Sequence, residues 1–303
     1  MSTVIQVDNI TKSYGDTKAV QGISFTVQKG EVFGIIGPNG AGKTTTIEML
    51  EGIRKPDNGK IDVLGLEPSR QLRELNKLIG VQFQATSIPK KMKVSEALDL
   101  FESFYPNNSQ KGGLIEQLGL QEKLNDSFEN LSGGWKQRVT LALATLHQPE
   151  IVFLDEPSMG LDPHARRELW SMIHLLKEQG CTIVVTTHYM EEAEKLCDRV
   201  AMIYGGQLKA LDTPRQLLDE MTVNYLSFQS DLFDYDGLLS LPSVIRVEHD
   251  HDTYKVYSEK LQQTAYHIFN YCHEKEIEIR NFKFEKGTLD DLFVHYLKKE
   301  ETA

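Results

Sequence analysis

Residues 37–44 read Gly-Pro-Asn-Gly-Ala-Gly-Lys-Thr, a match to the spacing G-x-x-x-x-G-K-[S/T]. An apolar run, Val32–Ile36, comes directly before them, and a helix is expected after them at Thr45–Glu51. Glycines allow successive backbone N–H groups to turn inward, and at the N-terminus of a helix such groups bind anions. The stretch therefore predicts a phosphate-binding loop between a buried strand and a helix.

Two further apolar runs, Ile151–Leu154 and Thr182–Thr187, lack the alternation of a half-exposed strand. Such runs are typical of parallel strands that are covered on both faces. Each ends in polar residues: Asp155 and Glu156 follow the first run, and His188 follows the second. Open α/β sheets bind ligands at the carboxyl ends of their strands. We therefore expect an α/β fold in which these residues meet the phosphate loop.

Each polar residue suits one part of nucleotide hydrolysis. Lys43 would reach the β- and γ-phosphates, and the Thr44 hydroxyl would ligate Mg²⁺. Asp155 suits a contact to Mg²⁺ through water, and Glu156 suits a general base for the attacking water. The alternative reading of the two acids is a helix start capped by Pro157, and the upstream loop weighs against it. These motifs alone indicate only a P-loop ATPase or GTPase.

A second glycine-rich stretch narrows the choice among P-loop ATPases and GTPases. Residues 131–138 read Leu-Ser-Gly-Gly-Trp-Lys-Gln-Arg, before a helix whose apolar residues are Val139, Ala142, Leu143 and Leu146. Ser132, Gly133 and Gly134 thus form a second anion-binding helix end. One loop already holds the phosphates, so a monomer has no evident need for another. Two copies arranged head to tail could each close this end on the partner's γ-phosphate, which makes assembly depend on ATP.

With these motifs in order over roughly the first 220 residues, the chain resembles the ABC ATPase family. The resemblance implies a P-loop NTPase fold of the ABC type: a mostly parallel sheet, a flanking antiparallel sheet and a helical signature subdomain. It implies ATP and Mg²⁺ as cofactors, and a head-to-tail homodimer. It also implies separate transmembrane permease subunits and a cytoplasmic location, peripheral on the inner face of the membrane.

The same resemblance assigns roles to single residues. Gln84 would link Mg²⁺ to the transport machinery, with Gln82 as the alternative, and Gly160-Leu-Asp162 would cross the dimer interface. His188 would hydrogen-bond the γ-phosphate, and Tyr14 would stack on adenine. The implied nucleotide-binding residues are Tyr14, Gly37, Pro38, Asn39, Gly40, Ala41, Gly42, Lys43, Thr44, Thr45, Gln84, Ser132, Gly133, Gly134 and Asp162. The catalytic residues are Glu156, His188 and Lys43, and the Mg²⁺ residues are Thr44, Gln84 and Asp155.

Composition limits the partners. The net charge of −11, with no obvious basic patch, argues against binding nucleic acid. The first residues do not resemble a signal peptide, and the apolar runs are far shorter than the ~20 residues of a membrane span. Three cysteines without metal-ligand spacing, Cys181, Cys197 and Cys272, are interpreted as reduced. Any membrane role is therefore expected to be peripheral.

The end of the chain differs in composition, since its last 83 residues hold 13 of the 26 aromatic residues. We expect an ATPase domain at residues 1–220 and a small α+β domain at 221–303, regulatory or dimerising. The expected elements are strands at Asn224–Gln229, Val244–Glu248, Tyr254–Ser258 and Ile277–Phe284, and helices at Leu261–His273 and Leu289–Leu297. Residues 287–294 resemble the tail of exporter ATPases for drugs, polysaccharides or lipids, which favours export.

The main alternative is a soluble ABC ATPase in a non-transport role such as cluster assembly. DNA-repair members carry a long coiled coil, but only 88 residues separate Thr44 from Gly133 here, without heptads. Trp135 stands where the family commonly has a polar residue, and we expect altered packing there with hydrolysis intact. Farther upstream, Asp57-Asn-Gly59 predicts a hairpin turn before a strand at Lys60–Leu64.

Overall fold

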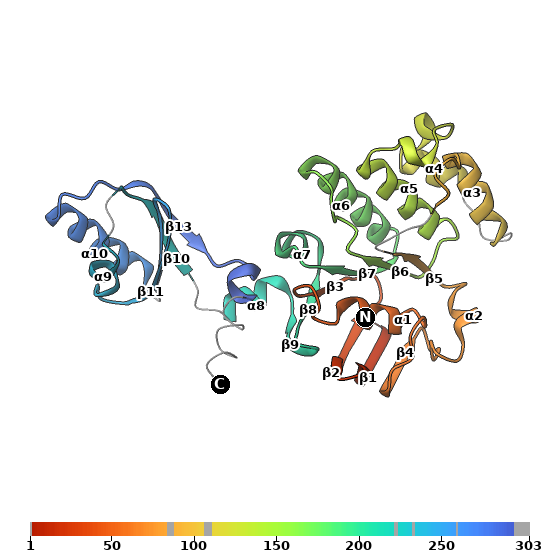
Figure 1. Cartoon of the computed structure of the whole chain (residues 1–303), viewed down its shortest axis with the longest axis horizontal. Helices are drawn as coiled ribbons and strands as arrows, with labels where there is room; N and C mark the ends of the chain where they lie inside the picture. Colours follow the sequence, from red (N-terminus) through yellow and green to blue (C-terminus); the bar gives the residue numbers. More distant parts are fainter. Residues whose placement is uncertain are drawn as a thin grey trace. The chain divides into compact units, whose positions relative to one another are not determined.

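The computed structural model describes residues 2–83, 88–105, 111–220, 224–231, 234–258 and 260–293. The chain divides into two compact units, Met1–Thr213 and Pro214–Ala303 (Figure 1). The division lies seven residues before the boundary expected at 220/221, so helix α8 (Pro214–Glu220) belongs to the second unit. Within the described residues, the helices are too short or too polar to span a bilayer.

The first unit is built on a six-stranded sheet in the order β5-β6-β7-β3-β8-β9. These strands are β5 (Ile79–Gln82), β6 (Ile151–Asp155), β7 (Thr182–Thr187), β3 (Val32–Ile36), β8 (Arg199–Tyr204) and β9 (Gln207–Asp212). The first five run parallel, and β9 pairs antiparallel with β8. All residues of β3, β6 and β7 are buried, as their unbroken apolar character predicts. This arrangement confirms the predicted α/β class.

A smaller antiparallel sheet joins β2 (Thr17–Gln28), β1 (Thr3–Tyr14) and β4 (Asn58–Val63) in that order. Its apolar side chains share a core with β3 and with helix α1 (Lys43–Leu50). The hairpin turn predicted at Asp57–Gly59 was wrong. Asn58 and Gly59 lie inside β4, which pairs with the distant β1, because the preceding element is a helix and offers no strand to fold back on.

Helices complete the first unit. They are α2 (Leu72–Leu75), α3 (Val94–Ser103), α4 (Lys111–Gln117), α5 (Gly133–Thr145), α6 (Pro163–Glu178) and α7 (Met190–Leu196), with short 3₁₀ turns at Gln121–Lys123 and Phe128–Asn130. The helices α3, α4 and α5 form a subdomain with its own core, which includes Leu98, Leu114, Val139 and Leu143 (Figure 1). The predicted helical signature subdomain is therefore present.

The second unit has a four-stranded antiparallel sheet in the order β11-β12-β10-β13. Its elements are β10 (Asn224–Gln229), α9 (Tyr235–Leu239), β11 (Val244–Asp250), β12 (Thr253–Ser258), α10 (Leu261–Glu274) and β13 (Arg280–Lys286). Phe228 stacks on Tyr254 and Phe282, and Ile268 of α10 covers them. The aromatic residues thus build a core of this unit's own. Residues 289–293 are helical, and the rest of the helix predicted at Leu289–Leu297 lies outside the described residues.

Candidate active site

Three strand ends meet at one edge of the large sheet. The adjacent parallel strands β6, β7 and β3 are in register, with Asp155 opposite Thr186 and Thr187 opposite Ile36. Their carboxyl ends therefore lie side by side. Residues 37–44 leave this edge from β3, Glu156 leaves it from β6, and His188 leaves it from β7.

Glycine is required at two points of the loop 37–44. Gly37 has φ of 152°, and a Cβ there would lie 2.1 Å from the carbonyl oxygen of Ile203. Gly42 has φ of 102°, and its Cβ would lie 2.3 Å from the carbonyl oxygen of Ala19. Any side chain would displace the loop from both sheets.

Lys43 folds back over the loop. Its Nζ donates hydrogen bonds of 3.0 Å to the carbonyl oxygens of both Gly37 and Pro38. The same Nζ lies 3.3 Å from Oε1 of Glu156, and the two side chains are only 4% and 7% exposed. The site thus holds a buried cation at the mouth of the loop, directly opposite a buried carboxylate.

Glu156 is contacted on both sides. Its Oε1 faces Lys43, and its Oε2 lies 3.0 Å from Nδ1 of His188, whose side chain is partly open to solvent. The backbone of Glu156 has φ of 47°, a left-handed conformation that is uncommon for this residue type. Its N–H holds this geometry by donating to the carbonyl oxygen of Thr186 at 3.1 Å and to the Thr186 hydroxyl at 2.9 Å.

Asp155 lies deeper than Glu156. Its Oδ1 accepts hydrogen bonds from the hydroxyls of Thr186 and Thr44, the latter at 3.5 Å. Burial raises the pKa of Asp155, and the neighbouring charge of Glu156 adds to this effect. A cation beside Asp155 would offset both causes, so its environment suits a metal ligand.

Thr186 is a site residue that the sequence reading missed. Its hydroxyl donates to Asp155 and accepts from the Glu156 backbone, so it connects the two acids. It lies in a run that was interpreted only as a buried strand. The available signal was the pair of hydroxyl residues at the carboxyl end of that strand, since a fully buried hydroxyl requires a hydrogen-bond partner.

The second glycine-rich stretch, Ser132–Gly134, forms the N-terminus of helix α5. Ser132 begins α5, and its Oγ accepts from the N–H of Trp135 at 3.4 Å. A Cβ at Gly134 would lie 2.9 Å from the Cβ of Ala165, so this helix start packs tightly on α6. A cavity of about 220 Å³ lies here, and both Ser132 and Asp162 line it.

Asp162 itself caps α6. Its Oδ1 accepts from the N–H groups of His164 and Ala165, at 2.9 and 3.0 Å. These two backbone bonds, that of Ala165 first, lower the pKa of Asp162. Within the described part of the chain, no hydrogen bond or ion pair joins Ser132 or Asp162 to residues 37–44.

The remaining predicted residues lie apart from this centre. Tyr14 ends β1 and is 42% exposed, with the Arg54 guanidinium 5.4 Å from its ring centroid. Gln84 lies outside the described residues. The alternative, Gln82, is buried at the end of β5, where its amide donates to Oε1 of Gln137 on α5.

Comparisons with known proteins identify the family of this chain. The family model for ABC transporters matches residues 20–159, and a model for the C-terminal domain of DrrA1-3-like ATP-binding proteins matches residues 213–297. A shorter match to an AAA domain covers residues 127–192. The Nod factor export ATP-binding protein I of Rhizobium etli is 42% identical over 224 residues, which span 72% of this chain and 71% of that protein. The chain belongs to the ABC transporter ATP-binding proteins.

This chain is also similar to other ABC transporter ATP-binding proteins, in sequence and in structure. A protein of Escherichia coli named "Probable multidrug ABC transporter ATP-binding protein YbhF" is 39% identical over 71% of this chain and 38% of its own length. Among solved structures, an ATP-binding cassette in its ADP conformation has a TM-score of 0.63 at 27% identity, covering 71% of this chain and 93% of that one. The cbiO1 protein of Clostridium perfringens has a TM-score of 0.63 at 28% identity, covering 73% and 92%. The chain is therefore an ATP-hydrolysing transporter subunit.

Proposed function

We propose that this ABC transporter ATP-binding protein drives export, with two copies closing head to tail on two Mg·ATP and thereby moving separate transmembrane subunits. The observation that carries the proposal is the chain of contacts Lys43–Glu156–His188 beside the loop 37–44. Glu156 contacts both Lys43 and His188, which supports the roles of phosphate-binding cation for Lys43, general base for Glu156 and hydrogen-bond donor to phosphate for His188.

Each member of this group has a chemical task. When ATP enters the loop, Lys43 leaves Glu156 and contacts the β- and γ-phosphate oxygens. The exchange is possible because the carboxylate and the phosphates are both negatively charged. Glu156 is then released to accept a proton from the attacking water. His188, 3.0 Å from Glu156, orients that carboxylate and donates to the γ-phosphate.

The residues beside Asp155 fit Mg²⁺. Carboxylate and hydroxyl oxygens are the ligands that Mg²⁺ prefers, and Asp155 and Thr44 supply one of each within 3.5 Å of each other. Gln84 is proposed as a further ligand. When bound, Mg²⁺ neutralises charge on the phosphate oxygens. The raised pKa of Asp155 supports this assignment because a cation would offset both the burial of the carboxylate and its repulsion from Glu156.

Dimerisation is supported by the position of the second helix end. Ser132 and Asp162 line one cavity, and neither bonds to residues 37–44 within the described part of the same chain. A second copy could bring its own loop and ATP to that cavity. Tyr14, exposed beside Arg54, is proposed to stack on adenine.

Export is supported by the relatives, which carry the names Nod factor export and multidrug transporter ATP-binding protein. We place the chain in the cytoplasm, peripheral on the inner membrane face, with the surface near residues 84–94 against the permease. The second unit, residues 214–303, is proposed to regulate or join the two copies. A role in cluster assembly has no such support.

The test is a pull-down of tagged Glu156→Gln protein with ATP from detergent-solubilised membranes of its own cells. Glu156→Gln should bind ATP and stay dimeric because it lacks the base. A co-purifying polytopic membrane protein is the expected result. Recovery of ribosomal, DNA-repair or cluster-assembly proteins without a membrane protein would overturn the transport role. The assignment as an ATPase would still hold.

A further inference from the structure

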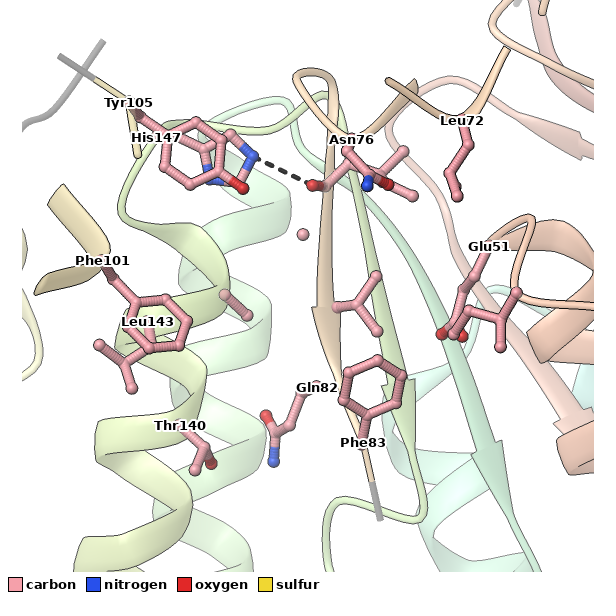
Figure 2. A pocket seen from close by; sticks show the side chains of 15 residues that line it. Glu51, Leu72, Asn76, Gln82, Phe83, Phe101, Tyr105, Thr140, Leu143 and His147 are labelled. Atoms are coloured by element: carbon pink, nitrogen blue, oxygen red, sulfur yellow. Dashed lines mark hydrogen bonds between the residues drawn. The ribbon is translucent and has the colours of Figure 1, made fainter. Parts of the chain in front are cut away.

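Two buried acids lie outside the chain of contacts Lys43–Glu156–His188. Glu51, 2% exposed, lines a cavity of about 310 Å³ along β5, and its Oε2 has no hydrogen-bond partner among the described residues (Figure 2). Glu192, 0% exposed, lies in α7 and is hydrogen-bonded to two other segments of the chain. A hydrophobic side chain often fills the place of a buried acid with equal or greater stability. Stability alone therefore does not account for Glu192.

The Oε1 atom of Glu192 accepts two hydrogen bonds. One comes from the hydroxyl of Ser158, a residue that is also fully buried. The other comes from Nε1 of Trp170 on α6, at 3.1 Å. One carboxyl oxygen thus joins α7 both to the segment that follows β6 and to the next helix along the chain.

Ser158 belongs to the tight turn that carries Glu156. The N–H of Met159 donates to the carbonyl oxygen of Glu156 at 3.1 Å, and the N–H of Leu161 donates to the carbonyl oxygen of Ser158 at 3.2 Å. The turn begins at the left-handed backbone of Glu156. A residue in such a conformation persists only where its surroundings hold it. The hydrogen bond from Ser158 to α7 lies two residues beyond this strained position.

The segment that follows β6 is tied at two points to the chain around His188. At its start, the N–H of Glu156 donates to the Thr186 hydroxyl at 2.9 Å. At its end, the Ser158 hydroxyl donates to Glu192. His188 lies between Thr186 and Glu192 along the chain, and it contacts Glu156 at 3.0 Å. The proposed base and its histidine are therefore held by anchors on both sides.

We propose that Glu192 is a positioning residue for hydrolysis, which acts through Ser158 to fix the turn that carries Glu156. The inference rests on the proposed function, because it requires Glu156 to be the general base. Its hydrogen bonds go to Ser158 and Trp170 rather than to the loop 37–44. Glu192 therefore sets the turnover number and leaves the affinity for ATP unchanged.

The test compares variants of the purified full-length chain by turnover number, ATP dissociation constant and thermal melt. Glu192→Met removes the acceptor at similar volume, and Glu192→Gln keeps an acceptor oxygen. Ser158→Ala removes the donor of the proposed link, and Trp170→Phe removes the other donor to the same oxygen. The matched control is Glu191→Gln, at the exposed acid next to Glu192 on α7. Glu156→Gln tests the base itself.

Glu192→Met and Ser158→Ala should each lower the turnover number about tenfold or more, because the base is displaced. The ATP dissociation constant should stay within about twofold of the parental value. The double variant should be no slower than either single variant, since both remove the same link. Glu192→Gln should keep at least about half of the parental rate. Trp170→Phe and Glu191→Gln should stay within about twofold of it, although Trp170→Phe lowers the melting temperature.

Ser158→Ala deletes a single oxygen, so it decides the question even if Glu192→Met folds poorly. A parental turnover number in Ser158→Ala, or fully additive losses in the double variant, would overturn the inference. Glu192→Gln as slow as Glu192→Met would overturn it too, because the amide keeps the acceptor. An equal loss of rate in Trp170→Phe, or ATP binding weakened together with the rate, would show a general packing role and also overturn it. A parental rate in Glu156→Gln would instead count against the proposed function.

Discussion

The Nζ of Lys43 and the Oε1 of Glu156 lie 3.3 Å apart, each on a side chain that is at least nine-tenths buried. This pair joins the group proposed to hold phosphate to the group proposed to activate water. If these proposed roles hold, ATP competes with Glu156 for Lys43, and Glu156 is released to act as the base when ATP binds.

The first prediction concerns Glu156→Gln. The amide cannot accept the proton from water, so hydrolysis should fall at least about 100-fold. ATP affinity should stay or rise, because an uncharged amide competes less with phosphate for Lys43. The steady-state rate and the ATP dissociation constant are the measurements. The exposed Glu150 provides a control, Glu150→Gln, and hydrolysis at the parental rate would exclude Glu156 as the base.

The second prediction concerns Thr186→Val, which keeps the shape and removes the hydroxyl that bonds Asp155 and the Glu156 backbone. Leaving these buried groups without partners should lower the free energy of unfolding by about 1–3 kcal/mol. The turnover number should fall because the Glu156 backbone loses one of the two hydrogen bonds that hold its left-handed geometry. Thr186→Ser keeps the hydroxyl and should restore most of the free energy of unfolding and most of the turnover number. If Thr186→Ser behaves like Thr186→Val, the hydroxyl is not the cause of either effect.

Trp135→Gln should separate packing from chemistry. Trp135 packs on the core of the helical subdomain, with the Arg138 guanidinium 4.4 Å from its ring centroid. Loss of this contact should lower the free energy of unfolding by about 1 kcal/mol. The Ser132 hydroxyl and both glycines remain, so the ATPase rate should stay unchanged. A large gain in rate would contradict this expectation.

Glu51 should make stability depend on pH. Its native pKa of about 8 lies above the ordinary 4.5, so between these values the native state holds a proton that the unfolded state has released. Stability should therefore fall as pH rises through this window and level off above it. Urea unfolding at about pH 5 and about pH 8.5 should give a gap between Glu51→Gln and the parent that widens by a few kcal/mol. A gap that does not change with pH would contradict the burial of an ionisable carboxyl.

Residues 1–213 alone should bind ATP with an affinity close to that of the full chain. The described residues of the proposed site lie in this unit, and the second unit has an aromatic core of its own. Isothermal titration of the two proteins compares them directly. A fragment that folds, by its thermal melt, but binds ATP tenfold more weakly would assign part of the site to residues 214–303.

Most of the framework could be predicted from the sequence because burial on both faces leaves unbroken apolar runs. Val32–Ile36 and Thr182–Thr187 coincide with β3 and β7, and Asn224–Gln229 coincides with β10. The prediction of a hairpin turn at Asp57–Gly59 was wrong because an Asn-Gly pair indicates only a local backbone preference. The pairing of β4 with β1 is a long-range contact that this preference does not reveal.

The site was predictable as a set of residue types but not as a network. Spacing placed Asp155 and Glu156 at a strand end and Lys43 in the loop that follows another strand, yet spacing alone does not say that Lys43 faces Glu156. The role of Thr186 depends on parallel register between β6 and β7, which no local pattern encodes. The unpaired acceptor of Glu51 was also invisible, because only three-dimensional packing reveals that a side chain lacks a partner.

The contacts that forbid a side chain at Gly37 and Gly42 are with backbone carbonyls, those of Ile203 in β8 and Ala19 in β2. Every amino acid carries that carbonyl, so no replacement at Ile203 or Ala19 can make room for a larger residue in the loop. Mutations at other positions therefore cannot compensate for replacing either glycine. A replacement at both positions would require both sheets to move. For protein engineers, the side chains at those neighbouring positions are open to redesign while the loop geometry stays fixed.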